Sequence, residues 1–347
     1  MTSQEQTTNK KRKQILGTVV ALVVLIIGAA GLFFWNRSEK AGGSSGVEST
    51  EDAKEDTIEK TTLTLNGTKY QMDYKVKAYL IMGTDASGNE DAEGEEYVGS
   101  MADFIQVLII DERKETCGIL TLNRDTITTV PLMNPDGTAN ATAELQLCTA
   151  HWYGGDKEMS CKNTVRTVKK MLGGLPISGY YALSMDAIGT LNHAVGGVEV
   201  TLEDDFSEMD PAMTVGTTLT LTDEQAVYFT RSRMNVGDGE NTSRMRRQKV
   251  YMNALAAKAK TLAAEDSKFM NRLIRELDAY ATTDRSVGQL TKIASQMQSY
   301  TDLGTFTPEG ETALGQRLGD GLDHTEFYMD EASLEECMKE LLPLSQQ

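Results

Sequence analysis

The 347-residue chain has few of the side chains on which much enzyme chemistry depends, with only three histidines and four cysteines. The histidines stand far apart in unrelated segments, which favours structural or exposed positions for His151, His193 and His324. No CxxC pair and no Cys/His cluster with zinc spacing is present, so a zinc site is not expected. A Ser/His/Asp set with a nucleophile elbow is missing as well, which argues against a serine hydrolase.

Basic residues are scarce too, with 34 against 51 acidic residues and a formal net charge of -17. This balance argues against general nucleic-acid binding, which needs a broad basic surface. Residues 228–248 nevertheless contain five arginines. Such a cluster within an acidic protein indicates a pocket for a defined anionic group. The alternative is a set of surface arginines that pair with the many carboxylates.

The spacing of these arginines favours the pocket. Arg231 and Arg233 are two apart in a β-prone run, so on a strand both side chains would point to one face. Arg244 and Gln248 are four apart after a cap-like Asn-Thr-Ser segment and would share a helix face, with Arg247 beside them. A Gly-Asp-Gly loop between the two segments would let the guanidinium groups converge. Guanidinium groups bind phosphate oxygens bidentately, so a phosphate ligand is predicted.

The long apolar run of the chain spans residues 15–35, the length of a membrane-crossing helix. Four basic residues precede it, so the positive-inside rule places residues 1–14 in the cytoplasm and the rest outside the cell membrane. The run is long for a signal-peptide core, which favours an uncleaved single-pass anchor over a cleaved signal. Residues 36–62 are Gly/Ser-rich and then charged, which predicts a flexible stalk.

The remaining chain predicts an α/β domain over residues 63–260 with a helical extension, 261–347, packed on it. Apolar strands are expected at residues 77–85, 104–111 and 117–123, and a charged turn makes the last two an antiparallel hairpin. Helices are expected near residues 163–172, 245–264, 267–280, 286–300 and 331–342. Strands and helices alternate without regular βαβ spacing, so a mixed central sheet flanked by helices fits best.

Charged residues stand at the ends of these strands. Asp85 ends the first strand, Asp103 immediately precedes the second, and Arg124 and Asp125 follow the third. Two carboxylates with room for water can hold Mg²⁺, which prefers few protein ligands and phosphate oxygens. Each aspartate alone would more often be a turn or cap residue, and their occurrence together with the arginine cluster favours the metal site.

Cys148 and Cys161 bracket a Gly-containing loop. A disulfide is permitted outside the membrane, so one bridge between them is predicted. The alternative is that all four cysteines are buried thiols.

Several of these segments occur in the order found in one family: GTD at 83–85, MADFIQVLIID, LNRDTITTVP, AHWYGG and YFTRSR…GDGENTSRMRRQ. Over residues 77–255 the chain resembles the LytR-CpsA-Psr (LCP) family. The resemblance implies a membrane-anchored phosphotransferase of cell-wall assembly. Such an enzyme moves a glycopolymer, for example teichoic acid or capsular polysaccharide, from a polyprenyl-pyrophosphate carrier onto peptidoglycan.

The resemblance also implies roles for single residues. Asp85 and Asp103 match the Mg²⁺-associated aspartates. The pyrophosphate-binding positions, with Gln248 as a further contact, are Arg124, Arg231, Arg233 and Arg244. Arg247 and Asn241, which stand beside them in the sequence, are also predicted to contact the pyrophosphate. The sequence departs from the family pattern in having Asn241 for an aspartate, Met101 for an arginine and Thr128 for a lysine.

A sugar hydroxyl of peptidoglycan would attack the sugar-linked phosphorus while the arginines and Mg²⁺ neutralise charge. Asp125 is a candidate base, although orienting a neighbouring arginine is the favoured role. Two other functions stay open: a non-catalytic binding or signalling module for prenyl-pyrophosphate or anionic wall polymer, and an adhesion or scaffold protein.

Overall fold

The computed structural model describes residues 61–72, 75–85, 99–134, 137–154, 156–232, 236–237, 241–266 and 268–347. The predicted cytoplasmic tail, the span at 15–35 and nearly all of the predicted stalk lie outside these residues. Within the described part of the chain, no helix has both the length and the apolar composition needed to cross a bilayer.

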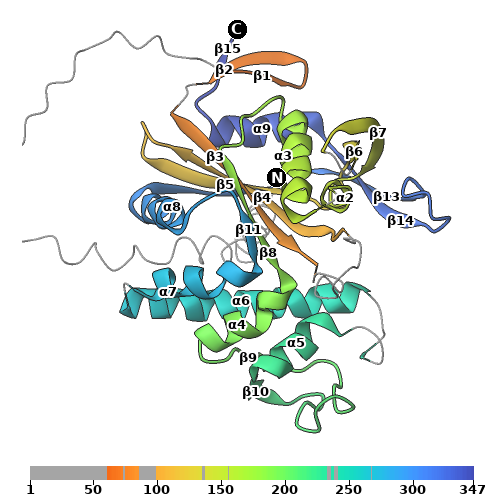
Figure 1. Ribbon diagram of the computed structural model, residues 1–347, viewed down its shortest axis with the longest axis vertical. Helices are drawn as coiled ribbons and strands as arrows, with labels where there is room; N and C mark the ends of the chain where they lie inside the picture. Colours follow the sequence, from red (N-terminus) through yellow and green to blue (C-terminus); the bar gives the residue numbers. More distant parts are fainter. Residues whose placement is uncertain are drawn as a thin grey trace, which may run out of the picture.

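A six-stranded mixed sheet forms the centre of the molecule, in the order β11-β8-β3-β4-β5-β12 (Figure 1). The strands span β3 Val76–Thr84, β4 Ala102–Asp111, β5 Thr116–Leu122, β8 Gly179–Ser184, β11 Ala281–Thr283 and β12 Thr301–Phe306. The predicted hairpin is confirmed, since β4 pairs antiparallel with β3 and with β5. β8 runs parallel to β3, and β12 runs parallel to β5. The prediction of a mixed sheet flanked by helices is therefore confirmed.

The central strands are apolar on both faces because helices cover both sides of the sheet. Leu80 of β3 faces one apolar core, and the next residue, Ile81, faces another. The first core is closed by α3, α9 and a small sheet of β1, β2 and β15, and the second by α8. The bounds are β1 Thr61–Leu65, β2 Thr68–Met72, α3 Lys157–Met171, α8 Val287–Ser299, α9 Glu331–Leu341 and β15 Ser345–Gln346.

Local signals explain where these helices begin. Helix α8 begins with a capping box, in which Ser286 and Gln289 bond reciprocally, at the predicted start of the helix. Helix α3 begins well before the predicted start at Asn163, because the side chain of Asp156 accepts the backbone N–H of Met159 and caps it there. The helix ends just before a pair of glycines, near the predicted end at residue 172, and Gly173 has a φ of 66°.

A second group of helices lies beyond the carboxyl end of β8, below the sheet in Figure 1. It packs around a third core, which Tyr181 and Leu183 of β8 enter from the sheet. The elements are η1 Met185–Ala187, α4 Ile188–Ala194, β9 Glu199–Thr201, β10 Thr218–Thr220, α5 Asp223–Arg231, α6 Asn241–Glu265, α7 Phe269–Glu276 and η2 Asp278–Tyr280.

The predicted arginine strand is a helix. Thr222 and Gln225 form a capping box that starts α5, and α5 continues to Arg231. Ala226 and Phe229, three apart, are both buried on one face of this helix. This spacing is that of an amphipathic helix, although the residues between them are β-prone. Arg233 lies outside the described residues.

Two hairpins, each a separate two-stranded sheet, and a short helix lie beside the central sheet on the side of α3 and α9 (Figure 1). They are β6 Ile127–Met133 with β7 Ala139–Gln146, α2 Thr149–Trp152, and β13 Gly310–Gly315 with β14 His324–Met329. The predicted helical extension at 261–347 therefore contains strands as well, including both edge strands of the central sheet, β11 and β12. It is an integral part of the same domain rather than a helical addition.

Candidate functional site

The predicted charged residues meet at one edge of the central sheet. β3 and β8 are parallel, and Thr84 at the end of β3 pairs with Ser184 at the end of β8. Asp85 and Asp186 follow these two residues closely and so leave the sheet at the same edge. β4 begins at this edge and β5 ends there, because β4 is antiparallel to β3 and β5 is antiparallel to β4.

A β-bulge determines the position of Asp103. Gly83 pairs with Phe104 and Thr84 pairs with Ala102, so Asp103 between them has no partner on β3. Beyond the bulge, the backbone N–H of Asp85 donates to the carbonyl of Met101 at 3.0 Å. An extra residue of this kind re-aims its side chain, and bulges are frequent beside functional sites.

The bulge brings two carboxyl groups together. Asp85 and Asp103 share a side-chain hydrogen bond, and the pKa of Asp85 is raised to about 6 by burial, by the negative charge of Asp103 and by that bond. The positive charges of Arg124 and Arg244 act in the opposite direction on this pKa. Asp85, Asp103, Arg124 and Arg244 therefore form one charged cluster.

Arg124 lies at the centre of this cluster with its side chain 25% exposed. Its Nη1 donates to Asp103, and its Nε lies 3.3 Å from the carboxylate of Asp125. The Nη2 group faces two sulfur atoms, Met101 Sδ at 3.4 Å and Cys148 Sγ at 3.3 Å. Sulfur is a weak acceptor, so an incoming phosphate oxygen can replace these contacts at small cost.

The contact of Asp125 with Nε of Arg124 fits the favoured role of Asp125, which is to orient this arginine. Burial raises the pKa of Asp125, the positive charge of Arg124 opposes that effect, and the charge of Asp103 adds to it. The backbone of Asp125 is also fixed, because its carbonyl accepts the N–H of Phe327 at 2.8 Å.

The other arginines of the cluster come from α5 and α6. Arg244 lies in the first turn of α6, near enough to Asp85 for its charge to lower the pKa of that carboxyl. Arg231 ends α5 and contacts Asp186 at 3.1 Å, with 41% of its side chain exposed. The contact with Asp186 ties Arg231 to the carboxyl end of β8. Asn241 begins α6.

Arg247 does not belong to this site, and the prediction that it binds pyrophosphate is wrong. Its side chain is 3% exposed. Each of its nitrogens donates inside the protein: Nε to the carbonyl of Phe229 at 3.1 Å, Nη1 to Asp204 at 2.6 Å, and Nη2 to the carbonyl of Ser232. The sequence placed Arg247 correctly beside the cluster, but packing turned its guanidinium group toward the end of α5.

Gln248 supports the same helix end, since its Nε2 donates to the carbonyl of Thr230 at 3.0 Å. The last carbonyls of a helix have no partner within the helix. Gln248 and Arg247 supply such partners and thereby hold Arg231 in place.

The predicted disulfide is also wrong, because Cys148 and Cys161 are both free thiols. They face different polar partners: Cys148 contacts Arg124, and Cys161 lies 3.8 Å from Nε2 of His151. Burial raises the pKa of Cys148 to about 11 and that of Cys161 to about 12. Cys148 and Met101 are the site residues whose role the sequence did not predict, because neither carries a charge that would mark it.

The carboxylates fit a magnesium ion that is shared with a substrate. No group of three or more His, Cys, Asp and Glu side chains within the described residues could hold a metal alone. Mg²⁺ in phosphate chemistry is usually bound by one or two carboxylates together with phosphate oxygens. Asp85 and Asp103 provide such a pair, and the negative charge of Asp103, which helps to raise the pKa of Asp85, marks a place where a cation would relieve repulsion.

The fold and the site define an α/β protein with a charged cluster at one edge of a mixed sheet. A crystal structure of a protein from Streptococcus agalactiae has this fold, with 21% identity, a TM-score of 0.54, and coverage of 77% of this chain and 88% of that one. The LytR_cpsA_psr family model matches residues 36–342, and the chain belongs to that family.

Two relatives illustrate the family. The chain is 22% identical over 333 residues to the polyisoprenyl-teichoic acid–peptidoglycan teichoic acid transferase TagU of Enterococcus faecalis, covering 96% of this chain and 94% of that protein. It is 25% identical over 248 residues to biofilm regulatory protein A of Streptococcus mutans, covering 69% of this chain and 58% of that protein.

Proposed function

We infer that this protein is a transferase that moves a glycopolymer from a polyprenyl-pyrophosphate carrier onto peptidoglycan. The observation that carries the proposal is the bulge at Asp103, which places a carboxylate against both Asp85 and Arg124 at the edge where Arg244 also lies. Family membership and the name of the TagU relative support the same reaction class.

The arginines neutralise the pyrophosphate. Arg124 offers the Nη2 group that faces two sulfur atoms, and Arg244 and Arg231 approach from α6 and α5. Asp125 orients Arg124 through its contact with Nε. Fixed positive groups of this kind stabilise the charge of a phosphoryl-transfer transition state without reorganising.

The reaction exchanges one phosphorus–oxygen bond for another. A peptidoglycan sugar hydroxyl attacks the phosphorus that carries the glycopolymer and forms a new O–P bond. The bond from that phosphorus to the bridging oxygen breaks, and polyprenyl monophosphate leaves. The hydroxyl proton ends on that monophosphate or on solvent, so the products are a phosphodiester and a phosphomonoester.

Asp85 and Asp103 would hold Mg²⁺, which when bound supplies further neutralisation of the pyrophosphate charge. The ionised pair is needed for this role. Since the pKa of Asp85 is about 6, Asp85 is mostly ionised at neutral pH.

We also propose that the protein is anchored in the cell membrane with this domain on the outer side. The support is the uncharged apolar run at residues 15–35 with basic residues before it. That location would bring the domain next to both a lipid-linked donor and peptidoglycan.

The test uses the full-length chain in detergent with a labelled lipid-pyrophosphate glycan, peptidoglycan and Mg²⁺. We expect labelled peptidoglycan from the wild type and a loss of about 10²-fold or more in Arg124→Ala. Arg272→Ala is the matched control, because Arg272 pairs with Asp266 on an exposed part of the surface away from the cluster. Binding of the lipid without any product would instead favour a binding or signalling module.

A further inference from the structure

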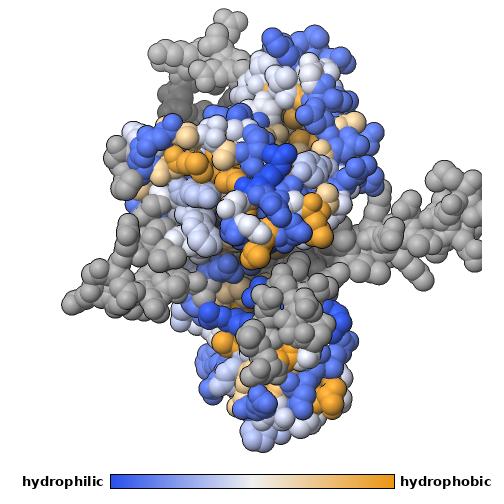
Figure 2. All heavy atoms as spheres, turned by 90° about the vertical axis from the view of Figure 1, so that its right-hand side faces the viewer, coloured by the Kyte–Doolittle hydropathy of each residue, from blue (hydrophilic) through white to orange (hydrophobic). Residues whose placement is uncertain are grey.

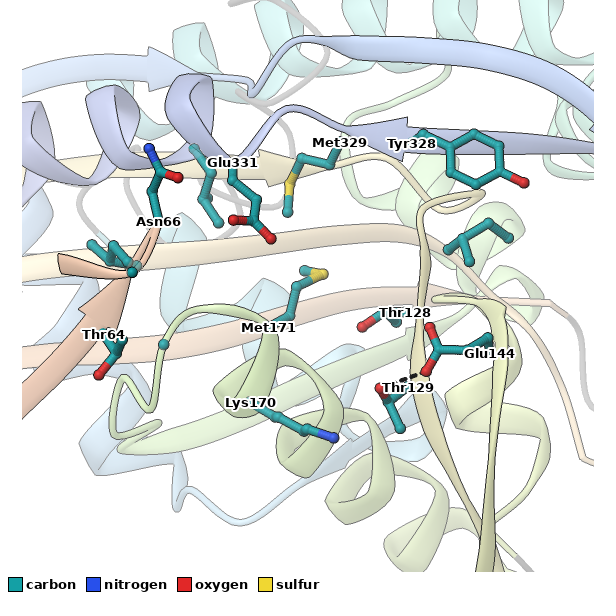
Figure 3. Close-up of a pocket in the computed structure, with 15 residues that line it drawn as sticks. Thr64, Asn66, Thr128, Thr129, Glu144, Lys170, Met171, Tyr328, Met329 and Glu331 are labelled. Carbon is teal, nitrogen blue, oxygen red and sulfur yellow. Dashed lines mark hydrogen bonds between the residues drawn. The ribbon is translucent and has the colours of Figure 1, made fainter.

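A groove of about 450 Å³ lies on the side of the sheet that α3 and α9 cover. We call it the hairpin groove. Its walls come from the β1–β2 turn, the carboxyl end of α3, the β6–β7 hairpin, the end of β14 and the start of α9 (Figure 3). These segments are far apart in the sequence, so the groove is a product of the tertiary fold.

One end of the groove lies close to the charged cluster along the chain. Strand β6 starts two residues after Asp125, and its first residues, Ile127 and Thr128, line the groove. On the other wall, Phe327 donates its N–H to Asp125 and forms a bridge with Thr126, and the next residue is the groove residue Tyr328. The loop that carries Arg124 is therefore fixed to both walls of the groove.

The lining has hydrogen-bonding groups beside apolar ones. Thr129 donates to Glu144 at 2.6 Å, and Lys170 extends from α3 in their direction (Figure 3). Tyr328 is 41% exposed, and Met171 also lines the groove. Hydroxyl, carboxylate, ammonium and aromatic groups together suit a sugar chain, which presents hydroxyl groups at its edges and C–H groups on its faces.

The charge of the groove lining favours an uncharged sugar chain over a phosphate-containing one. Its ionisable groups other than Tyr328 are Glu144, Glu331 and Lys170, so at neutral pH the groove carries one more negative than positive charge. A polymer with a phosphate in each repeat would be repelled there, whereas an uncharged chain would not. The surrounding surface, on the side that carries both hairpins, is mostly hydrophilic with small apolar groups (Figure 2).

We propose that the hairpin groove binds the acceptor: an uncharged chain of N-acetylated sugars, as in the glycan strand of peptidoglycan. This assignment rests on the proposed transferase function and adds where the acceptor lies. The glycan would run along β6 toward Arg124, so that one of its hydroxyl groups reaches the charged cluster while the anionic donor stays among the arginines.

Binding of chitotetraose, a neutral tetramer of N-acetylglucosamine, to the full-length chain in detergent tests the assignment by calorimetry. We expect Tyr328→Ala and Lys170→Ala to weaken binding about fivefold to tenfold, the effect of losing one good contact each. Tyr328→Phe keeps the ring and should bind like the wild type. Lys169→Ala is the control for Lys170→Ala, since Lys169 is the preceding exposed lysine of α3 and does not line the groove.

A glycerol-phosphate oligomer of equal length is the second probe. The assignment predicts that the wild type binds chitotetraose more tightly than the phosphate oligomer. The double variant Glu144→Gln/Glu331→Gln should reduce this difference between the two affinities. Tighter binding of the phosphate oligomer to the wild type would overturn the assignment, as would unchanged chitotetraose affinity in both Tyr328→Ala and Lys170→Ala.

Transfer assays separate this assignment from the proposed function. Groove variants should raise the KM for peptidoglycan, whereas Arg124→Ala should abolish transfer and keep chitotetraose affinity. Absence of transfer by the wild type would refute the transferase function, and the binding results would still decide whether the groove binds sugar.

Discussion

Arg124 and Arg247 each pair with an aspartate, yet the two regions around them use the guanidinium group differently. Around Arg247 every guanidinium nitrogen donates to a protein oxygen, the Phe206 ring lies 5.3 Å away, and the side chain is closed off from solvent. Around Arg124 two nitrogens meet carboxylates and the third faces sulfur atoms. Under the proposed function, unused bonding capacity and access, rather than position in an arginine-rich motif, distinguish the proposed ligand-binding Arg124 from the structural Arg247.

Replacing the structural arginine tests the comparison most strongly. Arg247→Ala should lower the free energy of unfolding by about 3–5 kcal/mol, because it leaves the carboxylate of Asp204 and two backbone carbonyls without their buried partner. Urea unfolding of the purified protein measures the change. If the unfolding free energy falls no more than it does on replacing an exposed arginine, the hydrogen bonds of Arg247 do not stabilise the end of α5.

Replacing Arg124, the proposed ligand-binding arginine, should reduce transfer and leave stability nearly unchanged. Arg124→Lys keeps the charge and loses the fork that bonds to phosphate, so transfer should fall about 10²-fold with the unfolding free energy changed little. The glycopolymer transfer assay and urea unfolding are run on the same preparation. Full transfer activity in this variant would contradict the role of Arg124.

The carboxylates beside Arg124 predict a dependence on pH. The pKa of Asp85 is raised from 3.8 to about 6 in the folded protein, so its contribution favours folding at low pH and is lost as pH rises through about 6. Asp85→Asn should therefore stabilise the metal-free protein at pH 7. It should also weaken the dependence of the unfolding free energy on pH between 3.8 and about 6. Thermal unfolding in EDTA across this range provides the measurement, and parallel profiles for the two proteins would contradict it.

The smallest effect on stability is expected from replacing Arg246, one residue before Arg247. Arg246 contacts Glu203 at 2.9 Å and the same Asp204 at 3.9 Å, but its side chain is 52% exposed. Arg246→Ala should change the unfolding free energy by less than about 1 kcal/mol, as for other solvated ion pairs. A large loss would show that the charge of Asp204, rather than burial, determines the stability of this region.

Several elements were predictable because their cause is local. The continuous apolar runs of β3, β4 and β5 mark strands buried on both faces, and the capping box at Ser286 marks the start of α8. Other elements depended on competing signals. Tyr228 to Thr230 favour a strand by propensity, yet the capping box at Thr222 and the burial of Phe229 make them helical. The strands β11 and β12 are short and weakly patterned, so only their pairing with β8 and β5 reveals them.

The sequence by itself determined the three central strands β3, β4 and β5, the start of α8, the acidic charge, and the placement of Asp85, Asp103 and Arg124 at strand ends. These follow from hydrophobic pattern and capping, which act over a few residues. Only the tertiary structure decided that Asp103 sits in a bulge, that Arg247 is closed off, that Cys148 lies against Arg124, and that four distant segments enclose the hairpin groove. Whether a polar group keeps bonding capacity for a ligand depends on which distant groups surround it, and these partners are set by packing.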